Sequence, residues 1–337
     1  MTIKQVAERA GVSLMTVSRV INKNGIVKST TRDRVQQAIN DLNYRPNISA
    51  RRLAGGKSLF LGLVYQNPSP SYLSSVLIGA LAACRAIGCH LVLEDLGQQA
   101  PYERPEETVQ SLKSAGLDGV IVTPPLSNHE PFIETLENYG LAVVRVAPKN
   151  IHTDKLRVAM DDTQAARDMM EYLVDAGHRQ IGFVKGPPTH ASSGHRLNGF
   201  LSGAREFKLN ISDDLLIQGD FTYRSGFDAG RELLSRPERP TAIFACNDDM
   251  AAGVVAAAYR QGLSVPDDVS VVGFDDTEIA TNIWPELTTV KQPIGEMADH
   301  AVRLLAASIR GQGETIQSMR ALLDHKIIER DTVRKLT

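Results

Sequence analysis

The sequence predicts a small all-α head followed by an α/β body of two doubly wound parallel-sheet lobes. Charge divides the chain in this way: residues 1–60 hold eleven Lys and Arg against three acids, a net charge of +8, whereas the other 277 residues carry −10. Periodicity divides it at the same place. Short helical patterns run to about residue 43, and after residue 58 apolar runs alternate with longer helical stretches.

Composition restricts the class of protein. The 337 residues are 42% hydrophobic and 23% charged, which is typical of folded proteins with a sizeable core. No apolar stretch approaches 18 residues and residues 1–7 lack a signal-peptide core, so we expect a cytoplasmic protein without a membrane partner. The cysteines Cys84, Cys89 and Cys246 form no C-x-x-C pair. The sequence has no phosphate loop, nucleophile elbow or metal-ligand cluster, so we expect no bound metal, no cofactor and no enzymatic activity.

The head is predicted to contain three short helices. The first fits residues 3–10 and ends at Gly11, which suits the left-handed conformation after a helix. The second runs from residue 14 to about 22 with Ser13 as its N-cap, and the third fits 30–43. Two helices joined by a tight glycine turn form a helix-turn-helix, whose second helix can enter a major groove. Periodicity alone also fits a generic three-helix bundle with a basic surface.

The body is predicted as two α/β halves. Candidate strands of the first half are 59–65, 90–94, 119–123 and 142–146, with helices near 72–87, 103–115 and 129–139. Those of the second are 181–184, 215–218, 242–245 and 269–274, with helices near 162–176, 193–208, 223–235 and 248–261. Alternating strands and helices indicate parallel sheets covered on both faces. Two such lobes suggest a ligand crevice between them, at the carboxyl ends of the strands.

Four segments of the sequence closely resemble one family. Residues 2–13 read TIKQVAERAGVS, 16–22 read TVSRVIN, 42–47 read LNYRPN and 50–54 read ARRLA. They resemble the DNA-binding head of the lactose/galactose repressor (LacI/GalR) family, and the resemblance continues to about residue 330. It implies a helix-turn-helix head over 1–46, a hinge helix over 47–57 and a periplasmic-binding-protein-like core over 58–337. The family's three crossings between lobes imply a first lobe of about 58–160 and 292–321, and a second of about 161–290 and 322–330.

The resemblance assigns DNA contacts to the head and hinge. Arg19 is a candidate base reader, because a guanidinium can grip guanine O6 and N7. Leu14 and Met15 occupy positions where the family's members differ in operator choice, and both are apolar here. Leu53 matches the leucine that wedges into the minor groove. The free-energy cost of unstacking the bases there is offset by contacts that the kinked duplex allows. The residues that match phosphate contacts are Ser13, Thr16, Ser18, Asn22, Tyr44, Asn47 and Arg51.

The resemblance also assigns effector contacts to strand ends of the body. Arg196, Asn247 and Asp275 match family effector contacts, and their chemistry suits a polyol. Phe221 and Tyr72 stand where the family often has further contacts. Each residue also has a structural interpretation, which would make Asn247 a helix cap, Asp275 a turn residue, Arg196 a surface ion-pair partner and Phe221 simple core.

Three basic residues depart from the family pattern. Arg145 lies inside an apolar strand, Lys185 follows another strand and His190 lies in the next loop. Near the crevice they suit a carboxylate- or phosphate-bearing sugar, and the alternative is that they pair with acids or point to solvent. His190 stands where the purine repressor has an arginine, which disfavours a purine.

These residues predict a sequence-specific transcriptional regulator. We expect a repressor of carbohydrate-utilisation genes that binds palindromic operator DNA as a homodimer, its affinity changed by a sugar, sugar acid or sugar phosphate. The alternatives are the same regulator controlled by a purine or by a phosphoprotein corepressor. A solute-binding protein is disfavoured because the sequence has a basic head and no signal peptide. After Arg330 only seven residues remain, too few for a heptad tail that would make a tetramer.

Overall fold

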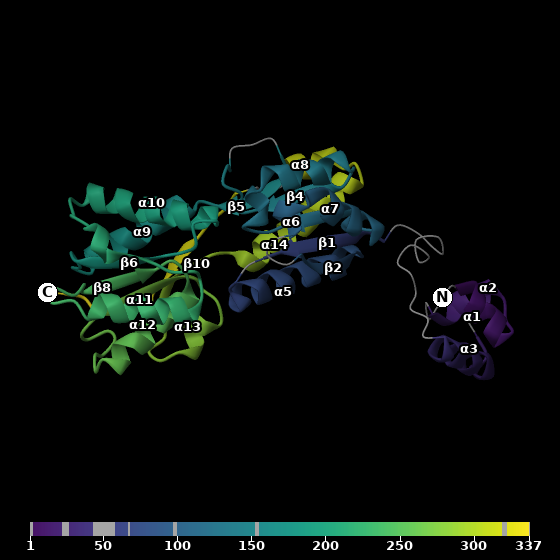
Figure 1. Cartoon of the computed structure of the whole chain (residues 1–337), viewed down its shortest axis with the longest axis horizontal. Coiled ribbons are helices and arrows are strands. Elements are labelled where there is room, and N and C mark those ends of the chain that lie inside the picture. The colour runs from purple at the N-terminus through teal and green to yellow at the C-terminus, as the bar shows by residue number, and fades with distance from the viewer. Residues whose placement is uncertain are drawn as a thin grey trace. The chain divides into compact units, whose positions relative to one another are not determined.

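The computed structural model describes residues 3–21, 27–42, 58–66, 68–96, 100–151, 155–318 and 322–336. The chain divides into two compact units, Met1–Ser58 and Leu59–Thr337 (Figure 1). They are called the head and the body below.

The head contains the three predicted helices, α1 Ile3–Ala10, α2 Leu14–Ile21 and α3 Ser29–Asp41. Gly11 ends α1 with φ +62°, and the Val12 N–H donates to the Ala7 carbonyl at 3.1 Å, which closes the last turn. Ser13 caps α2, because its Oγ accepts from the Thr16 N–H at 3.2 Å. One residue from each helix is completely buried, and these are Val6, Val17 and Val35.

Lobe 1 of the body is a parallel sheet with the strand order β11-β5-β4-β3-β1-β2. Its strands are β1 Phe60–Tyr65, β2 His90–Asp95, β3 Gly119–Val122, β4 Ala142–Val146, β5 Arg157–Met160 and β11 Leu322–Leu323. Its helices are α5 Pro70–Ile87, α6 Ala100–Glu103, α7 Pro105–Ser114, η1 Leu126–Asn128, α8 Glu130–Asn138, α14 Ile294–Ile309 and α15 Gly313–Ser318.

Lobe 2 repeats this plan with the strand order β12-β10-β9-β8-β6-β7, in which β12 pairs antiparallel with β10 and the other pairs are parallel. Its strands are β6 Ile181–Lys185, β7 Leu216–Gln218, β8 Ala242–Ala245, β9 Ser270–Asp275, β10 Thr288–Lys291 and β12 Lys326–Ile328. Its helices are α9 Asp162–Asp175, α10 Ala191–Glu206, η2 Asp213–Leu215, α11 Tyr223–Leu234, α12 Asp248–Arg260 and α13 Ile279–Asn282. Figure 1 shows α9 and α10 on one side of this sheet, and α11 and α12 on the other.

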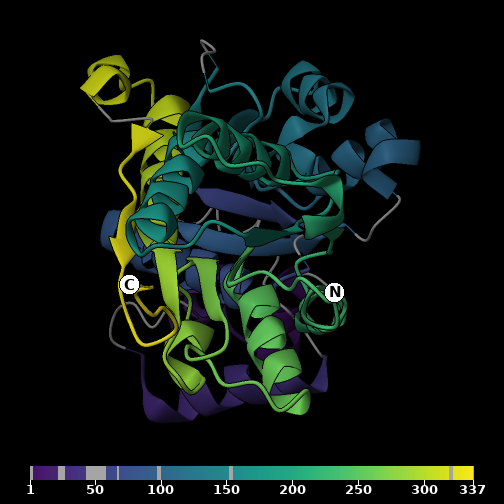
Figure 2. The same cartoon turned by 90° about the vertical axis from the view of Figure 1, so that its left-hand side faces the viewer.

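The predicted fold class, a helical head with two doubly wound parallel lobes, is confirmed. Four strands, β5, β10, β11 and β12, were not predicted. Each lies beside a point where the chain passes from one lobe to the other, so strands and helices of one lobe do not alternate there. The predicted boundary at 321–322 needs correction, since β11 pairs in parallel with β5 and therefore belongs to lobe 1. Lobe 2 also extends past residue 330, because the Leu336 N–H donates to the Ala176 carbonyl at 2.7 Å. Figure 2 shows this C-terminal segment, in yellow, along one side of the body.

Helix α5 packs against α14 in lobe 1 at a glycine contact. A Cβ on Gly79 would lie 2.4 Å from the carbonyl oxygen of Gly295, so only glycine permits this approach. By length and composition alone, α5 is the one helix of the described residues that could cross a membrane, a test that core helices of soluble proteins also pass. One stripe of α5 remains exposed, including Ile78 (64%) and Leu81 (54%).

Candidate functional site

A cavity lies between the two lobes, where strands of both sheets end. Six predicted effector residues line it, namely Tyr72, His190, Arg196, Phe221, Asn247 and Asp275. Five further lining residues were not predicted, namely Ser69, Pro124, Ala147, Ser192 and Gln292. The residues follow or end strands β1, β3 and β4 of lobe 1 and β6 to β10 of lobe 2. This is the position in which open α/β sheets bind ligands. We call it the inner cavity.

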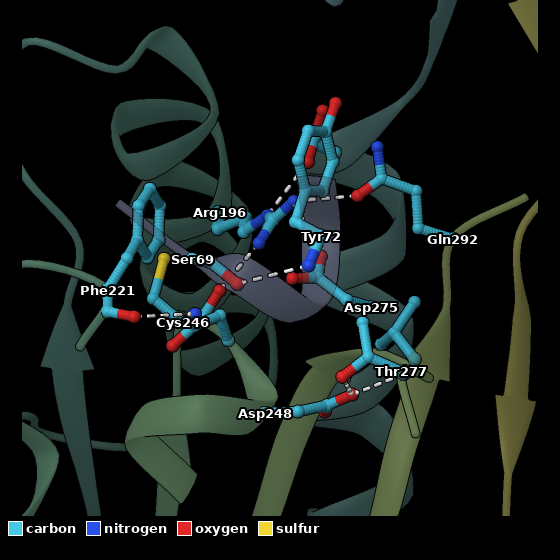
Figure 3. A network of polar contacts seen from close by, with 12 residues as sticks. Ser69, Tyr72, Arg196, Phe221, Cys246, Asp248, Asp275, Thr277 and Gln292 are labelled. Atoms are coloured by element: carbon cyan, nitrogen blue, oxygen red, sulfur yellow. Dashed lines mark hydrogen bonds and ion pairs between the residues drawn. The ribbon is translucent and has the colours of Figure 1, made fainter. Parts of the chain in front are cut away.

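Arg196 on α10 is the centre of the polar network in this cavity (Figure 3). Its side chain is 4% exposed, and Nε donates to Asp162 Oδ1 at 2.8 Å. Nη1 donates to the Cys246 carbonyl at 2.6 Å and Nη2 to Gln292 Oε1 at 3.2 Å. The guanidinium also stacks on the Phe274 ring, 3.6 Å from its centroid. Arg196 is therefore a buried, oriented hydrogen-bond donor, and the alternative that it is a surface ion-pair partner is wrong.

Asp275 brings a second charge into the cavity, at the end of β9. Its Oδ1 lies 3.4 Å from Arg196 Nη2, an ion-pair distance, yet this buried oxygen has no hydrogen-bond partner among the described residues. Burial raises the pKa of Asp275 well above its ordinary value, and Arg196 opposes that effect. Burial lowers the pKa of Arg196, but the attraction of Asp162 and Asp275 outweighs it, and the net shift is upward. A buried acceptor without a hydrogen-bond partner, beside an oriented donor, suits a ligand with hydroxyl groups.

The loop beyond Asp275 is fastened by Asp248 at the start of α12 (Figure 3). Asp248 Oδ2 accepts from the Thr277 N–H at 2.8 Å, and Oδ1 accepts from Thr289 Oγ1 at 2.6 Å. Burial raises the pKa of Asp248 to about 7, although these hydrogen bonds lower it in part. Asp248 therefore positions Asp275 through the backbone of the loop.

Backbone strain concentrates at the cavity. Ala147, Phe221 and Asp275 have φ angles of +45°, +68° and +119°, a region that L-residues adopt rarely and at a cost of about 1–3 kcal/mol each. Strain of this kind persists only where neighbouring contacts enforce it, and it clusters at ligand sites.

Asn247 holds Phe221 in its strained conformation. Its Nδ2 donates to the Phe221 carbonyl at 3.0 Å, while Oδ1 accepts from the Met250 N–H at 3.0 Å and caps α12. Gly186 leaves room for the Phe221 ring, since a Cβ there would lie 2.4 Å from Phe221 Cε1. Asn247 is thus a helix cap that also lines the cavity.

Two serines of lobe 1 contact a carboxylate of lobe 2 beside the cavity. Ser69 Oγ donates to Asp249 Oδ2 at 2.5 Å, and Ser71 Oγ donates to Asp249 Oδ1 at 3.3 Å. The free volume of the inner cavity is only about 20 Å³, close to that of a single water-sized sphere. A sugar ring can enter only if the lobes or the lining side chains move.

A wider space, the outer cavity, adjoins the inner one and has a volume of about 610 Å³. Residues of both lobes line it, including Asn128 and Lys149 of lobe 1 and Lys185 and His195 of lobe 2. His190 lines both cavities. Burial and the charge of Arg196 lower the pKa of His190 to about 4, so its imidazole is neutral near pH 7. Lys185 lines the outer cavity and not the inner one.

The proposal that Arg145 contacts an effector needs correction. Its guanidinium is bidentate on Glu130, with Nη2–Oε1 at 2.6 Å, and Nε donates to the Ser127 carbonyl at 2.7 Å. It lines neither cavity. The charged Arg145 can be buried in this apolar strand because Glu130, at the start of α8, forms an ion pair with it.

In the head, the outward face of α2 presents the predicted DNA contacts. Leu14 and Met15 are 49% and 64% exposed, and Arg19 and Ser13 are exposed as well. Thr16 is half-buried and hydrogen-bonds Ser13 Oγ at 3.0 Å. Predicted contacts outside the described part of the chain are the Ser18 side chain, Asn22, Tyr44, Asn47, Arg51 and Leu53, together with the hinge over 47–57.

The described residues contain no group of three or more His, Cys, Asp or Glu able to hold a metal ion. The three cysteines are buried and unpaired.

Comparisons with known proteins identify the family. Residues 2–47 match the model of bacterial regulatory proteins, lacI family, and 170–333 match a periplasmic binding protein-like domain. The ribose operon repressor of Escherichia coli K12 is 34% identical over 333 residues, covering 98% of each chain. The chain belongs to the LacI family.

Two further comparisons extend over nearly the whole length of this LacI-family chain. Catabolite control protein A of Priestia megaterium is 34% identical over 330 residues, covering 97% of each chain. The crystal structure of the lac repressor dimer bound to operator and the anti-inducer ONPF superposes with a TM-score of 0.75 at 28% identity, covering 99% of each chain. Family membership therefore extends over the head and both lobes.

Proposed function

We propose that this LacI-family protein is a cytoplasmic, sequence-specific transcriptional repressor of carbohydrate-utilisation genes, not an enzyme. A sugar or sugar derivative in the inner cavity changes its affinity for operator DNA. The observation that carries the proposal is the buried Asp275 Oδ1, which has no hydrogen-bond partner among the described residues and lies 3.4 Å from the oriented guanidinium of Arg196. Both groups lie between two lobes that are joined to a basic helix-turn-helix head.

The cavity residues divide the recognition of a sugar between them. Asp275 accepts hydrogen bonds from ring hydroxyls, and Arg196, already held by Asp162, donates to a sugar oxygen. Phe221 and Tyr72 supply apolar surface for the C–H face of the ring. A purine needs fewer such hydroxyl contacts, so this donor and acceptor set favours the sugar.

Control of DNA binding requires two arrangements of the lobes with different effector affinities. An effector shifts the equilibrium only by the difference between its affinities for the two arrangements. The contacts of Ser69 and Ser71 with Asp249 stabilise the narrow arrangement described above. A ring that enters the inner cavity must change these contacts or replace them, which provides the differential interaction.

We also propose that the protein acts as a homodimer on a palindromic operator. Exposed apolar residues on lobe 1, Ile78 and Leu81 of α5 and Leu93 of β2, form the face that a second copy would cover. The lac repressor, whose operator-bound structure is a dimer, has the same fold over 99% of this chain. A two-fold dimer presents two α2 helices to two half-sites.

Fluorescence anisotropy of a labelled fragment of the gene's own upstream region tests this function. Protein is titrated at near-physiological salt, with an unrelated fragment of equal length as the control for nonspecific binding. Neutral sugars, sugar acids and sugar phosphates are then added singly. Release by one compound supports an inducible repressor, and tight binding that requires a compound supports a corepressor. Binding that no small molecule changes contradicts sugar control and favours a phosphoprotein corepressor.

A further inference from the structure

The outer cavity is lined by basic side chains, which is unusual in a body whose net charge is negative. Lys149 and Lys185 approach it from different lobes, and His190 and His195 add imidazoles. None of the described residues that line it is Asp or Glu, although residues 61–337 carry a net charge of −10. Neither lysine has an ion pair within the described part of the chain.

The N-terminus of α10 opens into the same cavity. This 16-residue helix begins at Ala191, and its N-cap residue His190 gives it no side-chain hydrogen bond. The first N–H groups of a helix carry a partial positive charge and favour anions.

Two buried polar atoms at this helix end lack partners. His190 is 4% exposed and Ser193 is 5% exposed, and both residues line the outer cavity. Neither His190 Nε2 nor Ser193 Oγ has a hydrogen-bond partner among the described residues. His190 Nδ1 lies 3.3 Å from Thr189 Oγ1. If Nδ1 accepts from that hydroxyl, the neutral ring carries a donor, Nε2–H, that has no partner among the described residues.

We propose that the outer cavity binds an anionic group, a carboxylate or a phosphate, carried by the same effector whose ring occupies the inner cavity. Lys149 and Lys185 supply the charge, and Ser193 Oγ, His190 Nε2 and the start of α10 supply directed donors. Because His190 lines both cavities, one molecule can fill them together. The effector is then a sugar acid, a sugar phosphate or a glycoside with an acidic second unit. This inference rests on the proposed function for the identity of the ring.

Direct binding to the full chain tests the anionic subsite without operator DNA. Inorganic phosphate and D-glucuronate are titrated by isothermal calorimetry at constant ionic strength, against the wild type and the Lys149→Gln/Lys185→Gln variant. The charge-matched control is the double variant Lys326→Gln/Lys335→Gln, at two exposed lysines outside both cavities. We expect about a tenfold loss of affinity in the double variant and none in the control, since charge-assisted hydrogen bonds dominate such a site. Ser193→Ala should weaken the binding of the same anion.

Binding of phosphate alone identifies a phosphate subsite, and binding of glucuronate alone identifies a carboxylate subsite. Equal affinity in the wild type and the double variant, or binding of neither anion, overturns the proposal. The operator titration is an independent test. Once it has identified the effector, inorganic phosphate must compete with that effector for binding. A neutral effector also overturns the anionic assignment. Failure of operator binding with intact anion binding would instead contradict the proposed function.

Discussion

Replacing Asp275 by Asn removes the charge from the inner cavity at little cost in volume. Asn is preferred to Ala because it keeps the size and shape of Asp at residue 275, where φ is +119° and strains any β-carbon alike. Arg196 keeps its bonds to Asp162, the Cys246 carbonyl and Gln292. The lost ion pair and the relieved burial of a carboxylate oppose each other, so we expect the free energy of unfolding to change by about 1 kcal/mol or less.

The effect on the effector should be much larger. Hydrogen bonds to a charged group contribute about 1.5–3 kcal/mol each, and a carboxylate facing ring hydroxyls can accept two of them. Asn retains one neutral acceptor and presents an amide donor in place of the second. A loss of about 3 kcal/mol, or roughly a hundredfold in affinity, follows.

The assay is the operator anisotropy titration with the compound that the wild type recognises. Asp275→Asn should bind operator with wild-type affinity and need about a hundredfold more effector for half-maximal response. Asp267→Asn, at an exposed carboxylate outside both cavities, is the matched control. A half-maximal concentration within about threefold of the wild type, in a variant that unfolds normally, would refute the assignment of Asp275.

Further predictions concern the hinge, the dimer, pH and packing. Leu53→Ala should weaken specific DNA binding far more than nonspecific binding in anisotropy, and equal losses would contradict the wedge that the resemblance implies. Leu81→Asp should give a monomer by sedimentation equilibrium, since it charges an exposed apolar face of α5, and an unchanged dimer mass would count against that face. The pKa of His190 falls from 6.5 to about 4 on folding, so the unfolded state binds its proton first as pH drops. The wild type should therefore lose about 2 kcal/mol more than His190→Gln between pH 7 and pH 5 in urea unfolding, and parallel losses would contradict this. A Cβ at residue 226 would lie 2.1 Å from a backbone oxygen of α12, so Gly226→Ala should cost about 2–3 kcal/mol in thermal unfolding, unlike Gly313→Ala in open space.

The alternation of apolar runs with helical stretches made much of the body predictable. The predicted strands at 142–146 and 242–245 agree residue for residue with β4 and β8. The returns of the chain between lobes came only from the family resemblance, because β11 and β12 are two and three residues long and their pairing is decided by distant partners. A strand whose neighbours along the chain lie in the other lobe breaks the alternation of strands and helices that identified the rest.

The candidate site shows a similar limit. Residues of the effector motifs, such as Arg196 and Asp275, line one cavity together, and their role as effector contacts stays a prediction. Gln292 was missed because it follows β10, a strand that was not predicted. Arg145 was misplaced, since the sequence does not show that Glu130 lies within reach of it. Spacing identifies chemistry at strand ends, whereas pairing of charges depends on the packed fold.

The exchange of late segments between the lobes has a consequence for synthesis on the ribosome. Lobe 1 lacks α14 and β11 until the chain has passed residue 323, although its first strand begins at residue 60. Contacts between segments so far apart in sequence form slowly, and incomplete α/β lobes expose apolar surface meanwhile. Lobe 1 is completed by β11 at residues 322–323, and lobe 2 by the segment that reaches Leu336. The two lobes are therefore completed almost together during synthesis, and neither is finished well before the other.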